Sequence, residues 1–169
     1  MAKTCDNKSA GVLVWSDGKL LMIERKKYNF GFAVPAGHQD GEDAETAARR
    51  ELFEEMGINA PKLKKVVAKT LQNPCSYGKY HDWTIFEAGK WSGEPRMEPT
   101  EVKRYLWATA GEIQDMVRRL EEFAHSQNIP LEENSLPLIV AATNQIDSWR
   151  QNPGLEPPMY FLFKGAGII

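Results

Sequence analysis

Apolar residues along the chain form short runs with strand-like spacing, separated by turn residues. The turn Ser16-Asp17-Gly18 lies between the first two runs and is a hairpin signal. The runs predict strands over residues 10–15, 19–25, 30–34, 63–71, 80–90, 102–108 and 159–163. Helical spacing instead predicts helices over residues 112–122 and 136–149. The pattern therefore predicts a mixed α/β fold without repeats or a dividing linker.

A further helix is predicted between Asp43, which suits the N-cap, and Gly57, which suits the left-handed position after the last turn. Its apolar stripe consists of Ala44, Ala47, Ala48, Leu52 and Met56. At about 100° per residue, Glu51 and Glu55 fall among these apolar positions and Glu54 falls at their edge. The three carboxylates are therefore expected to face the body of the protein or its margin.

Carboxylates on the protein-facing side of a helix need partners, because burying an unpaired charge is costly. Glu51, Glu54 and Glu55 also repel one another as like charges. A divalent cation such as Mg²⁺, which takes oxygen ligands, would turn this repulsion into a binding site. The alternative is a solvated acidic face, but such a face should lie opposite the apolar stripe. The positions of the acids therefore favour a metal site.

Residues 36–58, AGHQDGEDAETAARRELFEEMGI, resemble the signature of the Nudix hydrolases, G-x5-E-x7-R-E-U-x-E-E-x-G-U, in which U is a bulky aliphatic residue. The matching positions are Glu42, Arg50, Glu51, Leu52, Glu54, Glu55, Gly57 and Ile58. The sequence departs from the signature at Ala36, which stands where the signature begins with glycine. Gly37 follows it, and Pro35-Ala36-Gly37 is a variant that members of the family also use.

The resemblance implies a single Nudix domain over residues 1–169, folded as an α/β/α sandwich with a mixed β-sheet. It implies Mg²⁺-dependent (or Mn²⁺-dependent) hydrolysis of a phosphoanhydride bond in a nucleoside diphosphate linked to a group X. The implied metal ligands are the backbone carbonyl of Ala36 and the side chains of Glu51, Glu54 and Glu55. Arg50 is expected to orient Glu51, and Glu42 to support the loop or bind a further ion.

The general base has several candidates, since family members take it from the acidic helix, here Glu51 or Glu54, or from outside it. Glu101 is the outside candidate, with Glu98 and Asp82 as rivals, although each could be an ordinary exposed acid. Two further polar residues, His38 and His81, could contact phosphate or could simply pack, and His125 is given no role.

Specificity is left open between a nucleoside triphosphate, ADP-ribose, a nucleotide sugar and a dinucleoside polyphosphate. Aromatic residues that could stack on a base are Tyr28, Phe30, Tyr77, Tyr80 and Trp83, although aromatics in strands usually belong to a core. Lys26 and Lys27 could meet a distal phosphate or face solvent. Pro35-Ala36-Gly37 favours the ADP-ribose type, and the loop 28–31, with the short chain, favours nucleoside triphosphates.

Composition narrows the class of partner. The 169 residues carry a net charge of −2, which gives no basic footprint for nucleic acid and makes decapping of RNA an unfavoured alternative. No apolar run approaches the length of a membrane span, and the start lacks the apolar stretch of a signal peptide. Cys5 and Cys75 are interpreted as ordinary reduced residues. A cytoplasmic enzyme with a small nucleotide-like substrate and unknown oligomeric state is therefore expected. The alternative is a non-catalytic ligand-sensing or protein-binding domain, which could have lost a signature glutamate, whereas all four are present.

Overall fold

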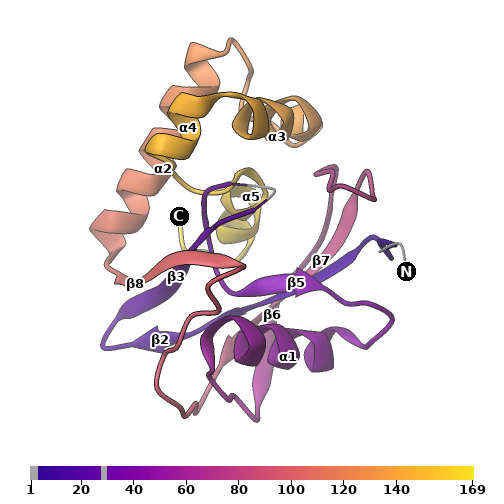
Figure 1. The fold of residues 1–169 in the computed structure, drawn as a ribbon, viewed down its shortest axis with the longest axis vertical. Coiled ribbons are helices and arrows are strands. Elements are labelled where there is room, and N and C mark those ends of the chain that lie inside the picture. Colours follow the sequence, from indigo (N-terminus) through magenta and orange to yellow (C-terminus); the bar gives the residue numbers. More distant parts are fainter. Residues whose placement is uncertain (1–3, 28–29) are drawn as a thin grey trace.

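The computed structural model describes residues 4–27 and 30–169. Two residues of the sequence predictions, Tyr28 and Asn29, lie outside the described residues. The strands form two sheets with helices on both sides (Figure 1), which confirms the expected α/β fold class with a mixed sheet.

The first sheet has the order β5-β1-β7-β6. Its strands are β5 (Ala36–His38), β1 (Lys8–Leu13), β7 (His81–Ala88) and β6 (Leu63–Leu71). β1 runs parallel to β7, whereas β1–β5 and β6–β7 are antiparallel pairs. The short strand β5 was not predicted by the sequence pattern, and it precedes the acidic helix in the chain.

The second sheet is built around β3, which pairs with β2, β4 and β8. The strands are β2 (Trp15–Ser16), β3 (Lys19–Arg25), β4 (Phe32–Ala33) and β8 (Val102–Ala108). Ser16 pairs with Lys19 across the predicted hairpin turn, and the predicted bounds of β3, β6 and β8 match the observed ones. The alternation of apolar side chains was therefore sufficient to locate most strands.

The acidic helix is α1 (Ala44–Met56), and its two ends are formed as predicted. The Asp43 side chain accepts a hydrogen bond from the Thr46 backbone N–H at 2.9 Å. Gly57 adopts the left-handed conformation with φ of 68°, and its N–H bonds to the Phe53 carbonyl. The beginning and the end of the helix are thus set by local sequence signals.

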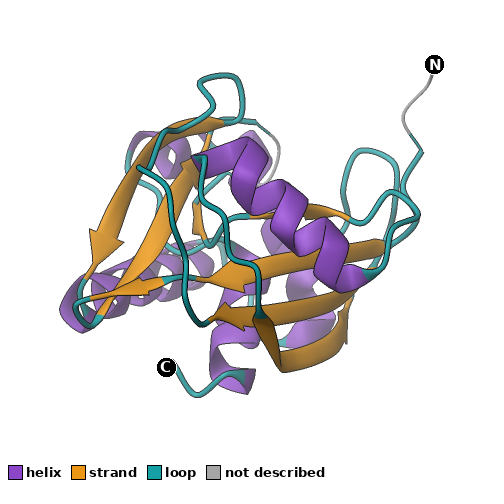
Figure 2. Cartoon of the chain, turned by 90° about the horizontal axis from the view of Figure 1, so that it is seen from below, coloured by secondary structure: helices purple, strands orange, loops and turns teal. Residues whose placement is uncertain are grey.

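Two apolar cores lie on opposite sides of the strands. One lies against α1, and the other lies against the C-terminal helices, which cover the opposite face (Figures 1 and 2). These helices are α2 (Ala110–Ser126), the 3-10 helix η1 (Glu133–Ser135), α3 (Leu136–Gln145), α4 (Asp147–Gln151) and α5 (Pro157–Gly165). Strand β3 serves both cores, since Leu21 and Ile23 face α1 whereas Leu20 and Met22 face the C-terminal helices.

Two predictions for the C-terminal part are wrong. Residues 159–163 form helix α5 and not a strand, because Pro157 and Pro158 start a helix that is buried all round, so its apolar run carries no periodicity. Residues 136–149 form two helices, α3 and α4, because Ile146 between them has an extended backbone.

Candidate metal and catalytic site

The acidic helix and strand β5 are joined at Ala36. The backbone N–H of Ala36 donates to Glu55 Oε1 at 2.8 Å, and its carbonyl oxygen accepts from Arg25 Nη2 at 3.2 Å. A carbonyl oxygen has two lone pairs, so the contact with Arg25 leaves one available to a cation. Ala36 is buried and is not among the residues with a positive φ, so its backbone does not require the glycine of the signature.

Gly37 lets the Glu51 carboxylate lie against the backbone of β5. A Cβ atom added at Gly37 would lie 2.3 Å from Cδ of Glu51, which is closer than real side chains approach. The site therefore requires glycine at Gly37, the second residue of the signature, and not at Ala36, the first. Its role is close approach of a carboxylate to the chain rather than a special dihedral angle.

Arg50 is the cationic partner of the acids on the outer side of α1. Its guanidinium donates hydrogen bonds to three carboxylates and one carbonyl oxygen, those of Glu42 at 2.8 Å, Glu51 at 2.8 Å, Glu54 at 3.4 Å and His38 at 3.0 Å. The Asp40 carboxylate lies 3.7 Å from Nη2. The pKa of Arg50 is raised, chiefly by its hydrogen bonds to Glu42 and Glu51, despite its partial burial. Arg50 thus stays charged and fixes the orientation of Glu51 relative to β5.

The three acids differ in exposure as the helix angles predicted. Glu55 is buried, Glu51 has a side chain 15% exposed, and Glu54 has a side chain 57% exposed. Burial raises the pKa of Glu55 to about 8, against the opposing effect of nearby Arg25. Burial also raises the pKa of Glu51, partly offset by Arg50. Near neutral pH, the buried carboxyl group of Glu55 is therefore largely protonated.

A buried ion pair that the sequence pattern did not reveal supports the inner side of the site. Arg25, at the end of β3, donates through Nε to Glu156 Oε2 at 3.0 Å, and both side chains are largely enclosed. Glu156 immediately precedes α5, so the pair joins the C-terminal helices to the carbonyl of Ala36. The sequence signal for this pair was the charged Arg25 at the end of an apolar strand. That signal indicates a buried charge but does not identify Glu156 as its partner.

Glu101 lies in the segment between β7 and β8, which is fastened to the end of α1. Backbone N–H groups of Arg96 and Glu98 donate to the carbonyls of Met56 and Glu55 at 2.8 and 2.9 Å. Glu101 has a half-exposed side chain 3.6 Å from Lys27 Nζ, and its charge contributes to raising the pKa of Glu55. It is therefore placed near the acidic helix.

The rival acids have other partners. The Glu98 carboxylate accepts hydrogen bonds from the backbone N–H groups of Thr100 and Glu101 at 3.0 and 2.9 Å, so it stabilises its own turn. Asp82 lies on β7 and accepts from Thr70 Oγ1 at 2.6 Å. Lys26, a candidate for contact with a distal phosphate, donates a hydrogen bond to the carbonyl oxygen of Pro99 at 2.9 Å.

The histidines and aromatic residues lie in four different settings. His38 and His81 lie against each other with ring nitrogens 3.2 Å apart, at the end of β5 and the start of β7. Trp83 is buried and donates to Asn73, as a core residue does. Phe30 is half-buried beneath Arg150, whose guanidinium lies 4.8 Å from the ring centre. Tyr77 and Tyr80 are exposed in the loop before β7.

Comparison with known proteins decides the family. A family model described as NUDIX domain matches residues 6–129. The chain belongs to the Nudix family. The match includes the whole of α1 and β5, and no curated protein sequence gave a match to the chain. Among the described residues, no helix has the length and apolar character needed to cross a membrane.

Solved structures agree with this assignment. The crystal structure of a MutT NUDIX hydrolase from Burkholderia pseudomallei is 27% identical, with a TM-score of 0.56 over 62% of this chain and 84% of that one. A NUDIX hydrolase from Nitrosomonas europaea is 18% identical, with a TM-score of 0.52 over 90% of this chain and 94% of that one. A UDP-X diphosphatase is 16% identical, with a TM-score of 0.53 over 66% of this chain and 54% of that one. The last two show likeness of fold alone. Family membership confirms the expected class of enzyme, a pyrophosphohydrolase.

Proposed function

We propose that this Nudix protein uses Mg²⁺, or Mn²⁺ in its place, to hydrolyse a phosphoanhydride bond in a small nucleoside diphosphate derivative. The observation that carries the proposal is the junction of α1 and β5, where Glu51 and Glu55 lie against the backbone of Ala36 and Gly37. We further propose that residues 1–169 act as one domain, because Arg25 and Glu156 link the Nudix signature to the C-terminal helices.

The donor set fits a hard divalent cation. Glu51, Glu54, Glu55 and the Ala36 carbonyl offer only oxygen atoms, which are the ligands of Mg²⁺. Mg²⁺ keeps several waters and binds substrate phosphates, so the protein need not supply a closed cage. When bound, the ion would neutralise phosphate charge and make a water molecule more acidic. The partly exposed Glu54 would lie on the substrate side of the site.

The residues around the acids have distinct tasks in this proposal. Arg50 positions Glu51, and Arg25 positions the Ala36 carbonyl. Glu101 takes a proton from the attacking water as general base. The water oxygen forms a bond to one phosphorus, the bridging P–O bond breaks, and its electron pair leaves with the second phosphate. Glu54 is the alternative base if the carboxylate of Glu101 does not reach the water.

A substrate panel tests the function. Purified protein with Mg²⁺ would be incubated with nucleoside triphosphates, ADP-ribose, nucleotide sugars and dinucleoside polyphosphates, and released phosphate or pyrophosphate measured. Turnover of at least one compound, abolished by EDTA and restored by Mg²⁺, is expected. Tight binding of one compound without turnover of any would instead establish a ligand-sensing domain.

The general base is tested by Glu101→Gln. Its turnover is expected to fall roughly 100-fold or more, with KM little changed, because a base acts in the transition state. Glu94→Gln is the matched control, since Glu94 is an exposed acid of the same loop. A loss smaller than about threefold in Glu101→Gln would move the assignment to Glu54.

A further inference from the structure

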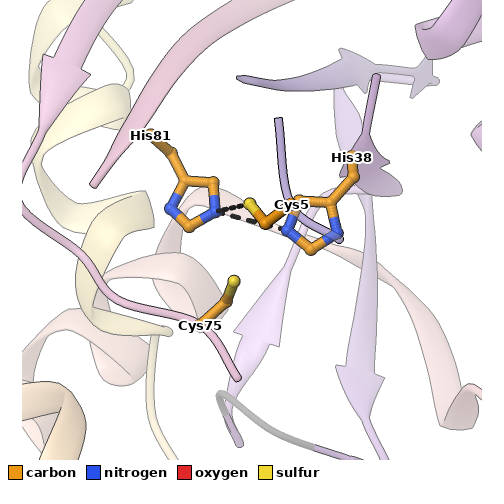
Figure 3. Close-up of side chains that lie close together, drawn as sticks. All are labelled: Cys5, His38, Cys75 and His81. Carbon is orange, nitrogen blue, oxygen red and sulfur yellow. Dashed lines mark hydrogen bonds between the residues drawn. The ribbon is translucent and has the colours of Figure 1, made fainter. Parts of the chain in front are cut away.

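Two thiols and two imidazoles meet at one end of the first sheet, away from the acids of α1. They belong to Cys5, His38, Cys75 and His81, which we call the Cys/His cluster (Figure 3). One ligand atom from each residue lies within 4.8 Å of all the others. The four residues come from four separate segments, so the grouping is produced by the strand order β5-β1-β7.

The distances within the cluster are close to the edges of a zinc tetrahedron. Nε2 of His81 lies 3.2 Å from Nε2 of His38 and 3.4 Å from Sγ of Cys5. Tetrahedral zinc with ordinary bond lengths would require about 3.3 Å between two nitrogens and about 3.6 Å between nitrogen and sulfur. A cation at the centre would therefore need the remaining ligands to move inward by about 1 Å or less.

The tautomer of His81 is fixed in the form that a metal needs. Its Nδ1 lies 2.7 Å from the backbone carbonyl of Asn73, so Nδ1 carries the hydrogen and donates. Nε2 then presents a lone pair to the middle of the cluster. Asn73 is itself held by Trp83, whose indole N–H donates to Oδ1 at 3.0 Å. Such an outer hydrogen bond is the usual support of a metal-bound histidine.

Both cysteine sulfurs receive the same kind of backbone support. The N–H of Asn7 donates to Cys5 Sγ at 3.3 Å, and the N–H of Tyr77 donates to Cys75 Sγ at 3.4 Å. In each case the donor lies two residues after the cysteine, so each sulfur sits inside a turn that stabilises negative charge on it. Gly78 allows the turn that follows Cys75 to approach Cys5, because a Cβ atom at Gly78 would lie 2.9 Å from Cys5 Sγ.

We propose that the Cys/His cluster is a structural zinc site. Sulfur and imidazole ligands in a tetrahedral arrangement select zinc over Mg²⁺, and four protein ligands leave no open position for catalysis. Two thiols would each release a proton to solvent on binding, so that two thiolates and two neutral imidazoles balance the charge of Zn²⁺. The complex would then be neutral overall, which avoids placing a net charge in this partly enclosed setting.

The zinc would fasten the N-terminal segment and the loop before β7 to strand β5. His38 ends the strand that begins with Ala36, and its carbonyl accepts from Arg50. The site would therefore hold β5 from the end opposite to the contact between Ala36 and Glu55. The proposal goes beyond the proposed hydrolysis and does not depend on it.

Metal content tests the proposal directly. Protein purified under reducing conditions without chelator is expected to contain about one zinc ion per chain, measured by inductively coupled plasma mass spectrometry. Cys75→Ser and Cys5→Ser are expected to contain at least tenfold less. His125→Gln is the matched control, a histidine of α2 outside the cluster, and should keep its zinc. Cys5 lies before β1, so Cys5→Ser keeps the test valid if Cys75→Ser fails to fold.

Cobalt distinguishes this site from the acids of α1. Metal-free protein loaded with Co²⁺ should show the intense visible bands of tetrahedral cobalt and a thiolate charge-transfer band. These bands should persist in Glu55→Gln, disappear in Cys75→Ser and be displaced by zinc but not by excess Mg²⁺. A weak octahedral spectrum unaffected by Cys75→Ser would overturn the proposal. So would a Cys5–Cys75 disulfide together with no zinc uptake after reduction.

Discussion

The two ends of strand β5 offer opposite kinds of donor. At Ala36 the neighbours are carboxylates and a backbone carbonyl, all hard oxygen donors, whereas His38 belongs to a group of nitrogen and sulfur atoms. The oxygen side is open, since Glu54 is largely exposed and bends toward Arg50. The Cys/His cluster is compact, since its four ligand atoms all lie within 4.8 Å of one another. Among the described residues, it is the group of His, Cys, Asp or Glu side chains that meets this distance.

The two groups of donors differ in where they lie in the sequence and in the chemistry that they suit. The proposed oxygen ligands come from residues 36–58, and helical spacing places the acids on one face. An open set of oxygen atoms leaves room for substrate phosphates and water, as catalysis requires. The sulfur and nitrogen atoms come from positions up to 76 residues apart and enclose a point, which suits a structural ion.

The largest expected effect that separates the two sites is that of Glu55→Gln. Turnover should fall roughly 100-fold or more, because loss of the proposed metal ligand should cost more than the 10–100-fold effect of changing an outer partner. The variant should stay folded, since burial keeps Glu55 largely protonated at neutral pH and glutamine has nearly the same shape. Steady-state kinetics over a Mg²⁺ titration and a circular dichroism spectrum provide the measurement.

The same variant should leave the Cys/His cluster unchanged. Its zinc content is expected to equal that of the wild type, whereas Cys75→Ser should lose zinc and keep most of its response to Mg²⁺. Loss of zinc in Glu55→Gln would mean that the two ends of β5 form a single metal site and not two separate ones.

The ion pair behind Ala36 should affect stability more than any surface acid. Glu156→Gln leaves the buried Arg25 without its carboxylate, and such a loss costs about 3 kcal/mol. Glu121→Gln, an exposed acid of α2, should change stability by less than about 0.5 kcal/mol. Urea unfolding of both variants is the measurement, and a change below about 1 kcal/mol in Glu156→Gln would show that Arg25 finds sufficient compensation elsewhere.

Gly37→Ala should damage the oxygen side through shape alone. The new methyl group would overlap Glu51, and overpacking of this kind costs about 1–3 kcal/mol. Turnover should fall along with the melting temperature, because Glu51 must move away from β5. Gly89→Ala is the control, since a Cβ at Gly89 meets no atom within 4 Å. Unchanged activity in Gly37→Ala would remove the close contact with Glu51 from the proposal.

Metal-free stability is also expected to depend on pH. Burial raises the pKa of Glu55 from 4.5 in the unfolded chain to about 8, so between these values the folded protein holds a proton that the unfolded chain has lost. Stability from this group therefore falls as pH rises through that window. Besides burial, the pKa of Glu55 is lowered by Arg25 and by the hydrogen bond from the Ala36 amide, and it is raised by Glu51 and Glu101.

Comparison of melting temperatures between wild type and Glu55→Gln isolates this dependence from other titrating groups. The wild type should lose stability relative to the variant between about pH 5 and pH 8 when EDTA is present. Saturating Mg²⁺ should reverse the trend, because the ion binds the ionised carboxylate. A difference between the two proteins that does not change with pH would mean that Glu55 titrates near its ordinary pKa.

Local sequence patterns predicted α1 with both caps, the hairpin at Ser16–Lys19 and the positions of most strands. They failed where local pattern is ambiguous, as for α5, whose apolar run is buried on every side. The inward rotation of Glu51 and Glu55 followed from helix angles. Their roles as ligands, and that of Glu101 as base, remain predictions for the experiments above.

The acidic helix, its caps and its Nudix signature can be recognised in the amino-acid sequence, because each depends on residues within a few turns of one another. The tertiary structure alone decided two features, the pair of Arg25 with Glu156 and the Cys/His cluster. Their members are far apart in the chain, and only the order of strands and the packing of α5 bring them together. Periodicity reports which face a residue occupies, whereas a contact between distant residues depends on how those faces are assembled.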